Sequence, residues 1–72
     1  MKKTFKLEEL ECAHCAAKME EAILKISGVD GASINFMMST LTIDADEAGF
    51  DLILKKASKA IRRIELDCYI VY

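Results

Sequence analysis

Proline is absent from the sequence, glycine occurs only three times, and no apolar stretch is long enough to cross a membrane. A membrane-spanning helix needs roughly 20 mostly apolar residues in a row, so we expect no direct membrane insertion of this chain. A concentrated positive charge is also missing, because ten basic and twelve acidic residues are mixed along both halves of the chain. Nucleic-acid-binding domains need such a basic surface, so a nucleic-acid partner is excluded.

What is present is typical of one small folded domain. The chain has 72 residues, of which 53% are hydrophobic and 31% are charged, and a chain of this length forms a single core. We therefore predict one domain over residues 1–72. We expect no secretion signal, since Met1-Lys2-Lys3 leads directly into a charged, strand-like segment. The chain has three cysteines, an odd number that cannot all pair in disulfides. This predicts reduced thiols and a cytoplasmic location.

Hydrophobic periodicity predicts six elements. Apolar and polar residues alternate in four short stretches, which indicates strands; these strands are expected at residues 4–7, 32–36, 41–45 and 68–72. Apolar residues recur at helical spacing from Cys15 to a stop at Ser27-Gly28, and again after Asp51, a plausible N-cap. Loops are expected at residues 8–14, 37–40 and 46–49. The order predicts an α+β, ferredoxin-like βαββαβ fold with a four-stranded antiparallel sheet and both helices on one face.

Cys12 and Cys15 lie where the first strand meets the first helix. Thiolates are the form of cysteine that binds metals, and two sulfurs at this spacing can converge on one ion, at roughly 2.3 Å each for zinc. The positive end of the helix favours an anionic sulfur, so we expect a lowered pKa for Cys15. Ala13 and Ala16 are small and allow the loop to lie close to an ion.

Other sites use the same cysteine spacing. A dithiol oxidoreductase of the thioredoxin type has a cis-proline beside the dithiol, and this sequence has no proline. A structural zinc site needs four ligands, and only Cys12, His14, Cys15 and Cys68 are available, without a second close pair. Two ordinary surface cysteines are the remaining alternative. The sequence favours a soft-metal site over these three.

Three stretches of the sequence carry a resemblance to a known family: residues 10–16, Gly28-Val29 and residues 32–36. With these stretches at matching offsets, essentially the whole chain resembles a heavy-metal-associated domain. The resemblance implies that Cys12 and Cys15 bind Cu(I), Zn(II), Cd(II), Pb(II) or Hg(II). Domains of this family serve as free metallochaperones or as cytoplasmic N-terminal domains of heavy-metal P-type ATPases.

The residues before the first cysteine indicate which metal is bound. Copper-handling members of the family tend to have Gly-Met-Thr-Cys, whereas this chain has Glu9-Leu10-Glu11-Cys12. In zinc- and cadmium-type members, a carboxylate at the place of Glu11 can be a third ligand. Two thiolates satisfy Cu(I), but a divalent ion retains charge and favours a further, harder donor. Zn(II), Cd(II) or Pb(II) is therefore the predicted ion, with Cu(I) possible; the alternative is that Glu11 is simply a solvated charge.

His14 and Cys68 are further candidate ligands. Imidazole binds zinc and copper, but the middle positions of such a loop usually point outwards, so docking or tuning of the thiolates is the favoured role of His14. A lone cysteine such as Cys68 is by default a small buried hydrophobe. The family's loop before the last strand approaches the metal loop, which leaves a third-sulfur role open.

Two other features are weighed against a metal role. Met37 and Met38 lie in the hairpin turn, which we expect at the end away from the first-strand loop or to its side, so we assign them to packing. The second helix has a basic face, for which a solvated surface is favoured over docking to an acidic partner. Its residues are Lys55, Lys56, Lys59, Arg62 and Arg63.

The sequence therefore predicts a monomeric domain that is not itself an enzyme. It captures a heavy-metal ion on Cys12 and Cys15 and transfers it by ligand exchange to or from a partner protein domain. The first choice is the cytoplasmic N-terminal domain of a P-type ATPase that exports Zn(II), Cd(II) or Pb(II). The alternatives are a Cu(I) metallochaperone or copper-ATPase domain and, from another class, a dithiol oxidoreductase.

Overall fold

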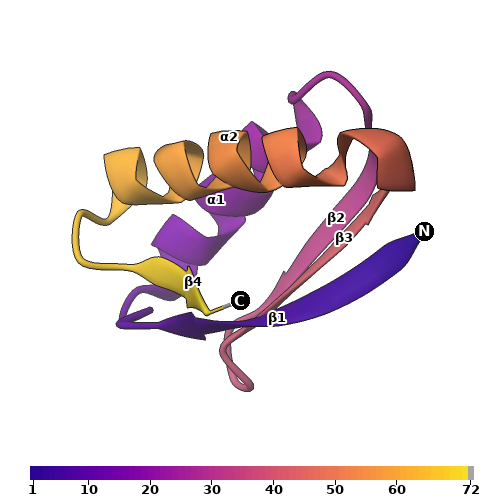
Figure 1. Cartoon of the computed structure of the whole chain (residues 1–72). Coiled ribbons are helices and arrows are strands. Elements are labelled where there is room, and N and C mark those ends of the chain that lie inside the picture. Colours follow the sequence, from indigo (N-terminus) through magenta and orange to yellow (C-terminus); the bar gives the residue numbers. More distant parts are fainter. Residues whose placement is uncertain (72) are drawn as a thin grey trace.

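Four strands and two helices follow one another in the predicted order in the computed structural model, which describes residues 1–71 (Figure 1). Tyr72, the end of the predicted last strand, lies outside the described residues. The elements are β1 (Lys2–Glu8), α1 (Ala13–Leu24), β2 (Val29–Asn35), β3 (Thr40–Ala45), the 3-10 helix η1 (Glu47–Gly49), α2 (Phe50–Ile64) and β4 (Tyr69–Val71). No helix among residues 1–71 has the length and apolarity needed to cross a membrane.

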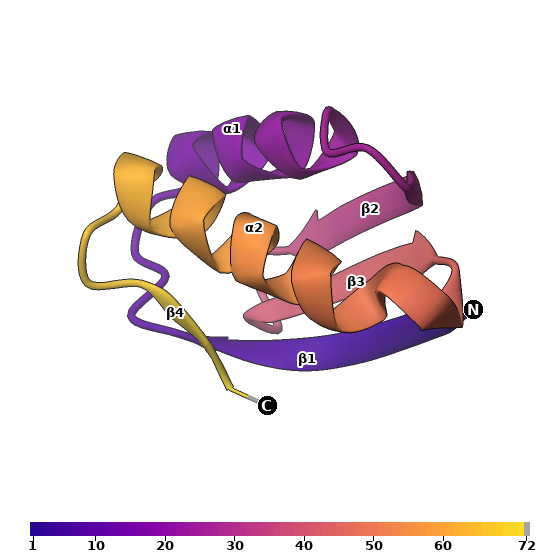
Figure 2. The same ribbon diagram turned by 45° about the horizontal axis from the view of Figure 1, so that its top comes forward.

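The strands form one antiparallel sheet in the order β2-β3-β1-β4. Both helices cover the same face of this sheet, and the two views agree on this (Figures 1 and 2). The predicted α+β, ferredoxin-like architecture is therefore confirmed. β1 is a central strand, so the chain that leaves its C-terminal end enters α1 directly above the sheet. This connection places the two cysteines at one end of the helix layer.

The core lies between the sheet and the two helices. Alternate residues of the strands point into it, among them Leu7, Leu41, Ile43 and Ile70. α1 contributes Ala16, Met19 and Ile23, and α2 contributes Phe50, Ile53, Leu54, Ala57 and Ile61. The sequence places an apolar stripe on the second helix, and the structure buries all of it except Ile64, which is half-buried; the stripe consists of Leu54, Ala57, Ile61 and Ile64. Strands bury every second residue and helices bury one stripe of residues, so the strand and helix periods of the hydrophobic residues in the sequence identify the core.

Several predicted boundaries are wrong by a few residues. The loop after the first strand is shorter than predicted, because β1 extends to Glu8 and α1 starts at Ala13. α1 ends at Leu24, and a turn over residues 25–28 connects it to β2. Asp51 lies in the first turn of α2, where a carboxylate favours the helix N-terminus, but the N-cap is Gly49.

Gly28 has a φ of +96°, the left-handed conformation expected for the glycine of this turn. A Cβ at this position would lie 3.2 Å from Cδ1 of Ile53. We expect Gly28→Ala to lower the free energy of unfolding by about 1–3 kcal/mol, because strain at a positive φ adds to the close contact. Gly31→Ala is the matched control, since its Cβ would meet only Asp44 Cβ at 3.7 Å. Equal losses in urea titrations of the two variants would contradict the prediction.

The turn between β2 and β3, residues 36–39, lies at the same end of the sheet as the loop after β1. The N–H of Leu7 donates to the carbonyl of Ser39 at 2.7 Å. The sequence allowed two places for this turn, the end of the sheet away from the β1–α1 loop or a position beside that loop. The first is wrong, because the turn lies beside the loop. Met37 and Met38 are 90% and 67% exposed, so their assignment to packing is also wrong. The turn projects beyond the helix-covered part of the sheet, where these side chains have little to pack against.

Candidate metal-binding site

The loop between β1 and α1 turns sharply at its first residue. Glu9 has a φ of +61°, in the left-handed region, which reverses the chain as it leaves the sheet. Leu10 follows and packs its half-buried side chain against the core. Cys12 then has an extended backbone and is the N-cap of α1. The loop is therefore short and held at both sides, by the sheet and by the helix.

The two thiols lie together at the start of α1. The backbone N–H of Cys15 donates to Sγ of Cys12 at 3.2 Å, and the N–H of Ala16 donates to the Cys12 carbonyl at 3.0 Å. The Cys12 sulfur thus takes the place of the side-chain oxygen that usually caps a helix. Both cysteines are half-buried and unoxidised. The structure presents a preformed pair of sulfur donors with one side open to solvent.

Of the two thiols, Cys12 ionises more readily than Cys15. The pKa of Cys12 is lowered because its sulfur accepts a hydrogen bond from the Cys15 side chain and another from the Cys15 backbone. The pKa of Cys15 is raised to about 11, since its thiol donates that bond and is also desolvated next to the Cys12 charge. The predicted lowering at Cys15 is therefore wrong. The N-cap of α1, which faces the free N–H groups of the first turn, is Cys12 and not Cys15. A charge on the Cys12 sulfur then disfavours a second charge on the neighbouring Cys15 sulfur.

A small acidic pocket adjoins the loop. Its volume is about 190 Å³, and four carboxylates line it together with Leu66. These carboxylates belong to Glu9, Glu11, Glu65 and Asp67. Two come from the β1–α1 loop and two from the α2–β4 loop, and both views show these loops at the same end of the molecule (Figures 1 and 2). The pocket therefore combines an acidic surface with the end of the domain that holds the dithiol.

Glu65 is the residue that the sequence interpretation missed. It ends α2, and its carboxylate oxygen Oε1 is buried without a hydrogen-bond partner within residues 1–71. Its negative charge acts on all three thiols: it adds to the raised pKa values of Cys15 and Cys68 and opposes the lowering at Cys12. A side-chain hydrogen bond with Glu65 is a further cause of the raised Cys15 pKa, so only Oε1 lacks a partner, and a buried polar atom without one is costly. The sequence did contain a signal for Glu65. It directly follows the apolar stripe of the second helix, and the predicted topology places the end of that helix near the loop between the first strand and the first helix.

The other predicted site residues are distributed unevenly. Glu11 is exposed and lines the acidic pocket, and His14 is exposed on the first turn of α1. Cys68 is fully buried in the core just before β4, and burial raises its pKa to about 11. Among residues 1–71, no three His, Cys, Asp or Glu side chains are already arranged to hold a metal ion. The structure brings Cys12 and Cys15 together and leaves any third donor to be recruited.

Comparison with protein families gives one match that covers most of the chain. Residues 4–66 match the sequence model of the heavy-metal-associated domain. The chain is 34% identical over 65 residues to the cadmium, zinc and cobalt-transporting ATPase of Bacillus subtilis. It is 35% identical over 48 residues to the copper chaperone CopZ of Enterococcus hirae. These stretches cover 90% and 67% of the chain, but the first amounts to only 9% of the ATPase, against 70% of the chaperone.

Solved structures resemble the whole fold. The N-terminal domain of a potential copper-translocating P-type ATPase from Bacillus subtilis, in its Cu(I)-loaded state, superposes with a TM-score of 0.75 at 26% identity. This similarity covers 96% of the chain and 84% of that structure. A CopZ metallochaperone gives a TM-score of 0.76 at 21% identity and covers 99% of the chain and 100% of that structure. The second likeness concerns the fold alone.

Proposed function

Because the chain belongs to the heavy-metal-associated domain family, we propose that it binds one divalent heavy-metal ion on Cys12 and Cys15 and transfers it to another protein. The ion is Zn(II), Cd(II) or Pb(II). The two sulfurs already lie together at the helix start, where the partial positive charge supports the thiolate form. One side of the pair is open, so that thiolates of a partner can enter as those of this chain leave. Such exchange needs an open site, unlike the closed four-ligand sites of structural zinc.

The preference for a divalent ion rests on one observation, the acidic pocket that adjoins the thiol pair. Cu(I) is a soft ion that two thiolates satisfy, whereas a divalent ion keeps a positive charge that carboxylate oxygens neutralise. Glu65 is the favoured third donor, because its buried Oε1 lacks a hydrogen-bond partner among the described residues. Glu11 is exposed on the same pocket and is the second candidate, able to swing towards the ion.

The domain acts as a metal carrier and not as an enzyme on its own. We assign it to the cytoplasmic N-terminal part of a P-type ATPase that exports divalent ions. Support comes from the resemblance to the cadmium, zinc and cobalt-transporting ATPase and to the zinc/cadmium/lead-transporting P-type ATPase of Escherichia coli, which is 32% identical over 62 residues. Its partner is another metal-binding domain or the pump itself, and the carrier is a monomer.

A Cu(I) carrier is the second candidate function. The copper-exporting P-type ATPase of Bacillus subtilis is 40% identical to the chain over 43 residues, and the chaperone resemblance points the same way. The two thiols alone would serve this function. The role of the carboxylates therefore separates the two candidates.

The test is to replace the pocket carboxylates one at a time. We expect Glu65→Gln to weaken Cd(II) binding by roughly 10- to 100-fold, the range seen when a supporting group of a metal site is removed, and Glu11→Gln to have a smaller effect. Cu(I) affinity should change by less than about twofold in both variants, because two thiolates satisfy Cu(I). Affinities are measured by competition with chromophoric chelators on the reduced protein.

Glu47→Gln is the matched control for this experiment. Glu47 carries the same charge in η1, which follows β3 at the end of the sheet away from the dithiol. It should leave both affinities unchanged. If neither Glu65→Gln nor Glu11→Gln weakens Cd(II) binding, the third-donor proposal fails and the Cu(I) carrier becomes the better reading.

A further inference from the structure

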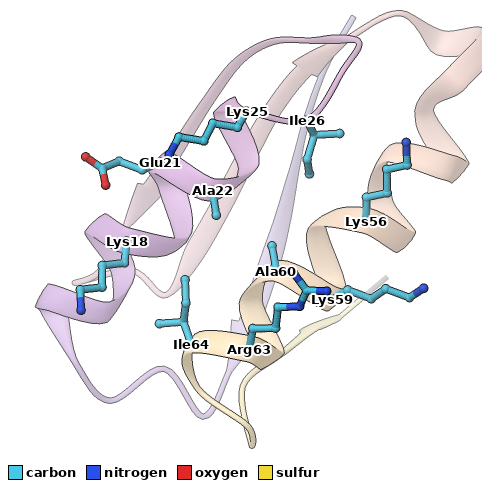
Figure 3. A pocket seen from close by; sticks show the side chains of 10 residues that line it. All are labelled: Lys18, Glu21, Ala22, Lys25, Ile26, Lys56, Lys59, Ala60, Arg63 and Ile64. Atoms are coloured by element: carbon cyan, nitrogen blue, oxygen red, sulfur yellow. The ribbon is translucent and has the colours of Figure 1, made fainter.

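A groove of about 480 Å³ runs between the outer faces of α1 and α2 (Figure 3). Its floor is apolar and half-buried, whereas its rim carries charged and exposed side chains. In Figure 3, Ala22 of α1 and Ala60 of α2 point towards each other from the two helices. Because both residues are small, the helices leave an open channel here instead of closing over it. Ile26 and Ile64 complete the apolar floor.

The rim of this interhelical groove is strongly basic. Five of its residues are cationic and one, Glu21, is acidic; in Figure 3 the side chains of Lys18, Glu21 and Lys25 all extend to the side of α1 away from α2. The cations are Lys18, Lys25, Lys56, Lys59 and Arg63. None of them forms an ion pair within residues 1–71, where the two ion pairs found involve Met1 with Asp44 and Lys6 with Glu8. The groove thus concentrates half of the ten basic residues of a chain whose net charge is −2.

We propose that the interhelical groove binds an acidic, amphipathic segment of a partner protein. Carboxylates of such a segment would meet the lysine and arginine side chains on both rims, and its small apolar side chains would cover the floor between Ala22 and Ala60. Charge complementarity of this kind sets orientation and speeds encounter, while burial of apolar surface contributes affinity. The groove volume lies within the range of ordinary binding pockets.

The shape of the groove separates this occupant from other anions. A flat bilayer surface reaches the rim cations but not a concave apolar floor. A nucleic-acid backbone supplies phosphates without aliphatic groups to cover that floor. An amphipathic peptide with acidic and apolar side chains at helical spacing provides both, in the manner of a helix lying in a groove.

The groove also leads towards the dithiol. Lys18 lies six residues after Cys12, which is roughly 9 Å along a helix axis at 1.5 Å per residue. On the other helix, Arg63 and Ile64 directly precede Glu65. A segment docked here would extend to the acidic end of the domain and hold its parent protein next to the metal loop. The docking itself does not depend on the metal that the loop carries.

The experiment uses the reduced, metal-free chain with both site cysteines replaced (Cys12→Ser, Cys15→Ser), so that a failure of the metal proposal leaves it unaffected. The probe is a synthetic, fluorescein-labelled peptide of roughly 15 residues, long enough for helix formation. It carries glutamates on one face and alanine and leucine at helical spacing on the other. We expect NMR shift changes centred on Ala22, Ile26 and Ala60, and binding that weakens as salt screens the charges.

Two groove variants and one control make the test specific. The double variant Lys25→Glu, Lys56→Glu should weaken peptide binding roughly tenfold or more, since it removes two attractions and adds two repulsions. Ala60→Leu, which narrows the floor without changing charge, should weaken it as well. The control Lys2→Glu, Lys6→Glu makes the same charge change on β1, outside the groove, and should alter affinity by less than about twofold.

Three results would overturn the proposal. The first is equal weakening in the groove and control variants, which would indicate general charge attraction. The second is equal affinity for a peptide of the same composition in scrambled order. The third is the absence of peptide-induced shifts in the groove while vesicles of phosphatidylglycerol perturb its rim, which would identify a lipid surface.

Discussion

Replacement of Cys12 or Cys15 by serine is expected to weaken Cd(II) binding by roughly 10²- to 10³-fold. Structural zinc sites with four ligands release about 10–16 kcal/mol on binding, which corresponds to roughly 2.5–4 kcal/mol for each donor. A site that begins with two sulfurs has no spare thiolate to replace the one that is lost. The remaining candidate donors, Glu11 and Glu65, supply carboxylate oxygens, which a soft ion binds less strongly than it binds sulfur.

Cys68→Ala is the control for this pair of variants. Cys68 is fully buried in the core and 0% exposed, so its removal should cost stability but leave the Cd(II) affinity of the folded protein within about threefold. A loss as large as that of Cys12→Ser would make Cys68 a ligand and contradict the two-thiolate site. Competition with a chelator of known affinity gives the constants, and circular dichroism confirms that each variant is folded.

The same variants separate metal transfer from dithiol redox chemistry. A dithiol oxidoreductase would reduce insulin with turnover and would lose that activity in either serine variant. We expect no turnover from the wild-type chain, because its sequence has no proline to adjoin the dithiol. Robust turnover would replace the metal-carrier proposal with the redox alternative.

The fold could be predicted from the sequence because its periods are clean. Leu41, Ile43 and Ala45 alternate with polar residues, and Leu54, Ala57 and Ile61 recur at helical spacing; all six are buried. With two βαβ crossovers in the order βαββαβ, the right-handedness of each crossover leaves few arrangements of the elements. Boundaries were less accurate, because the start of α1 depends on a sulfur accepting a backbone N–H. Sequence rules reserve that capping role for oxygen.

The candidate site could be predicted only in part. The spacing of Cys12 and Cys15 was sufficient to locate the sulfur pair, since a local motif needs no tertiary information. Glu65 could not be recognised in the same way, because it lies 50 residues after Cys15 and only the packed α2–β4 connection returns it to the loop. The burial of Cys68 and the exposure of His14 agree with what the sequence favoured, because a lone cysteine is usually a small buried hydrophobe and the middle of such a loop usually points outwards.

That packing also governs the second large effect, on stability. We expect Ile61→Ala to lower the free energy of unfolding by about 2–5 kcal/mol, the usual loss for a large aliphatic side chain in a core. Ile61 is fully buried on α2 beneath the end that carries Glu65. A domain of this size has a total stability of roughly 4–11 kcal/mol at 0.05–0.15 kcal/mol per residue. The variant should therefore unfold at a clearly lower urea concentration than the wild-type chain.

Leu52→Ala is the matched control, because Leu52 lies on the same helix but is 58% exposed. It should change the stability by no more than about 0.5 kcal/mol. Urea titrations followed by circular dichroism measure both variants, and equal losses would show that α2 is not anchored through Ile61. Cd(II) at about 100 times its dissociation constant should restore roughly 2.7 kcal/mol to Ile61→Ala if it binds the folded state alone. The same concentration should restore nothing when Cys12→Ser is added, because the stabilisation comes from metal held on a dithiol that exists only while α1 and α2 remain packed on the sheet.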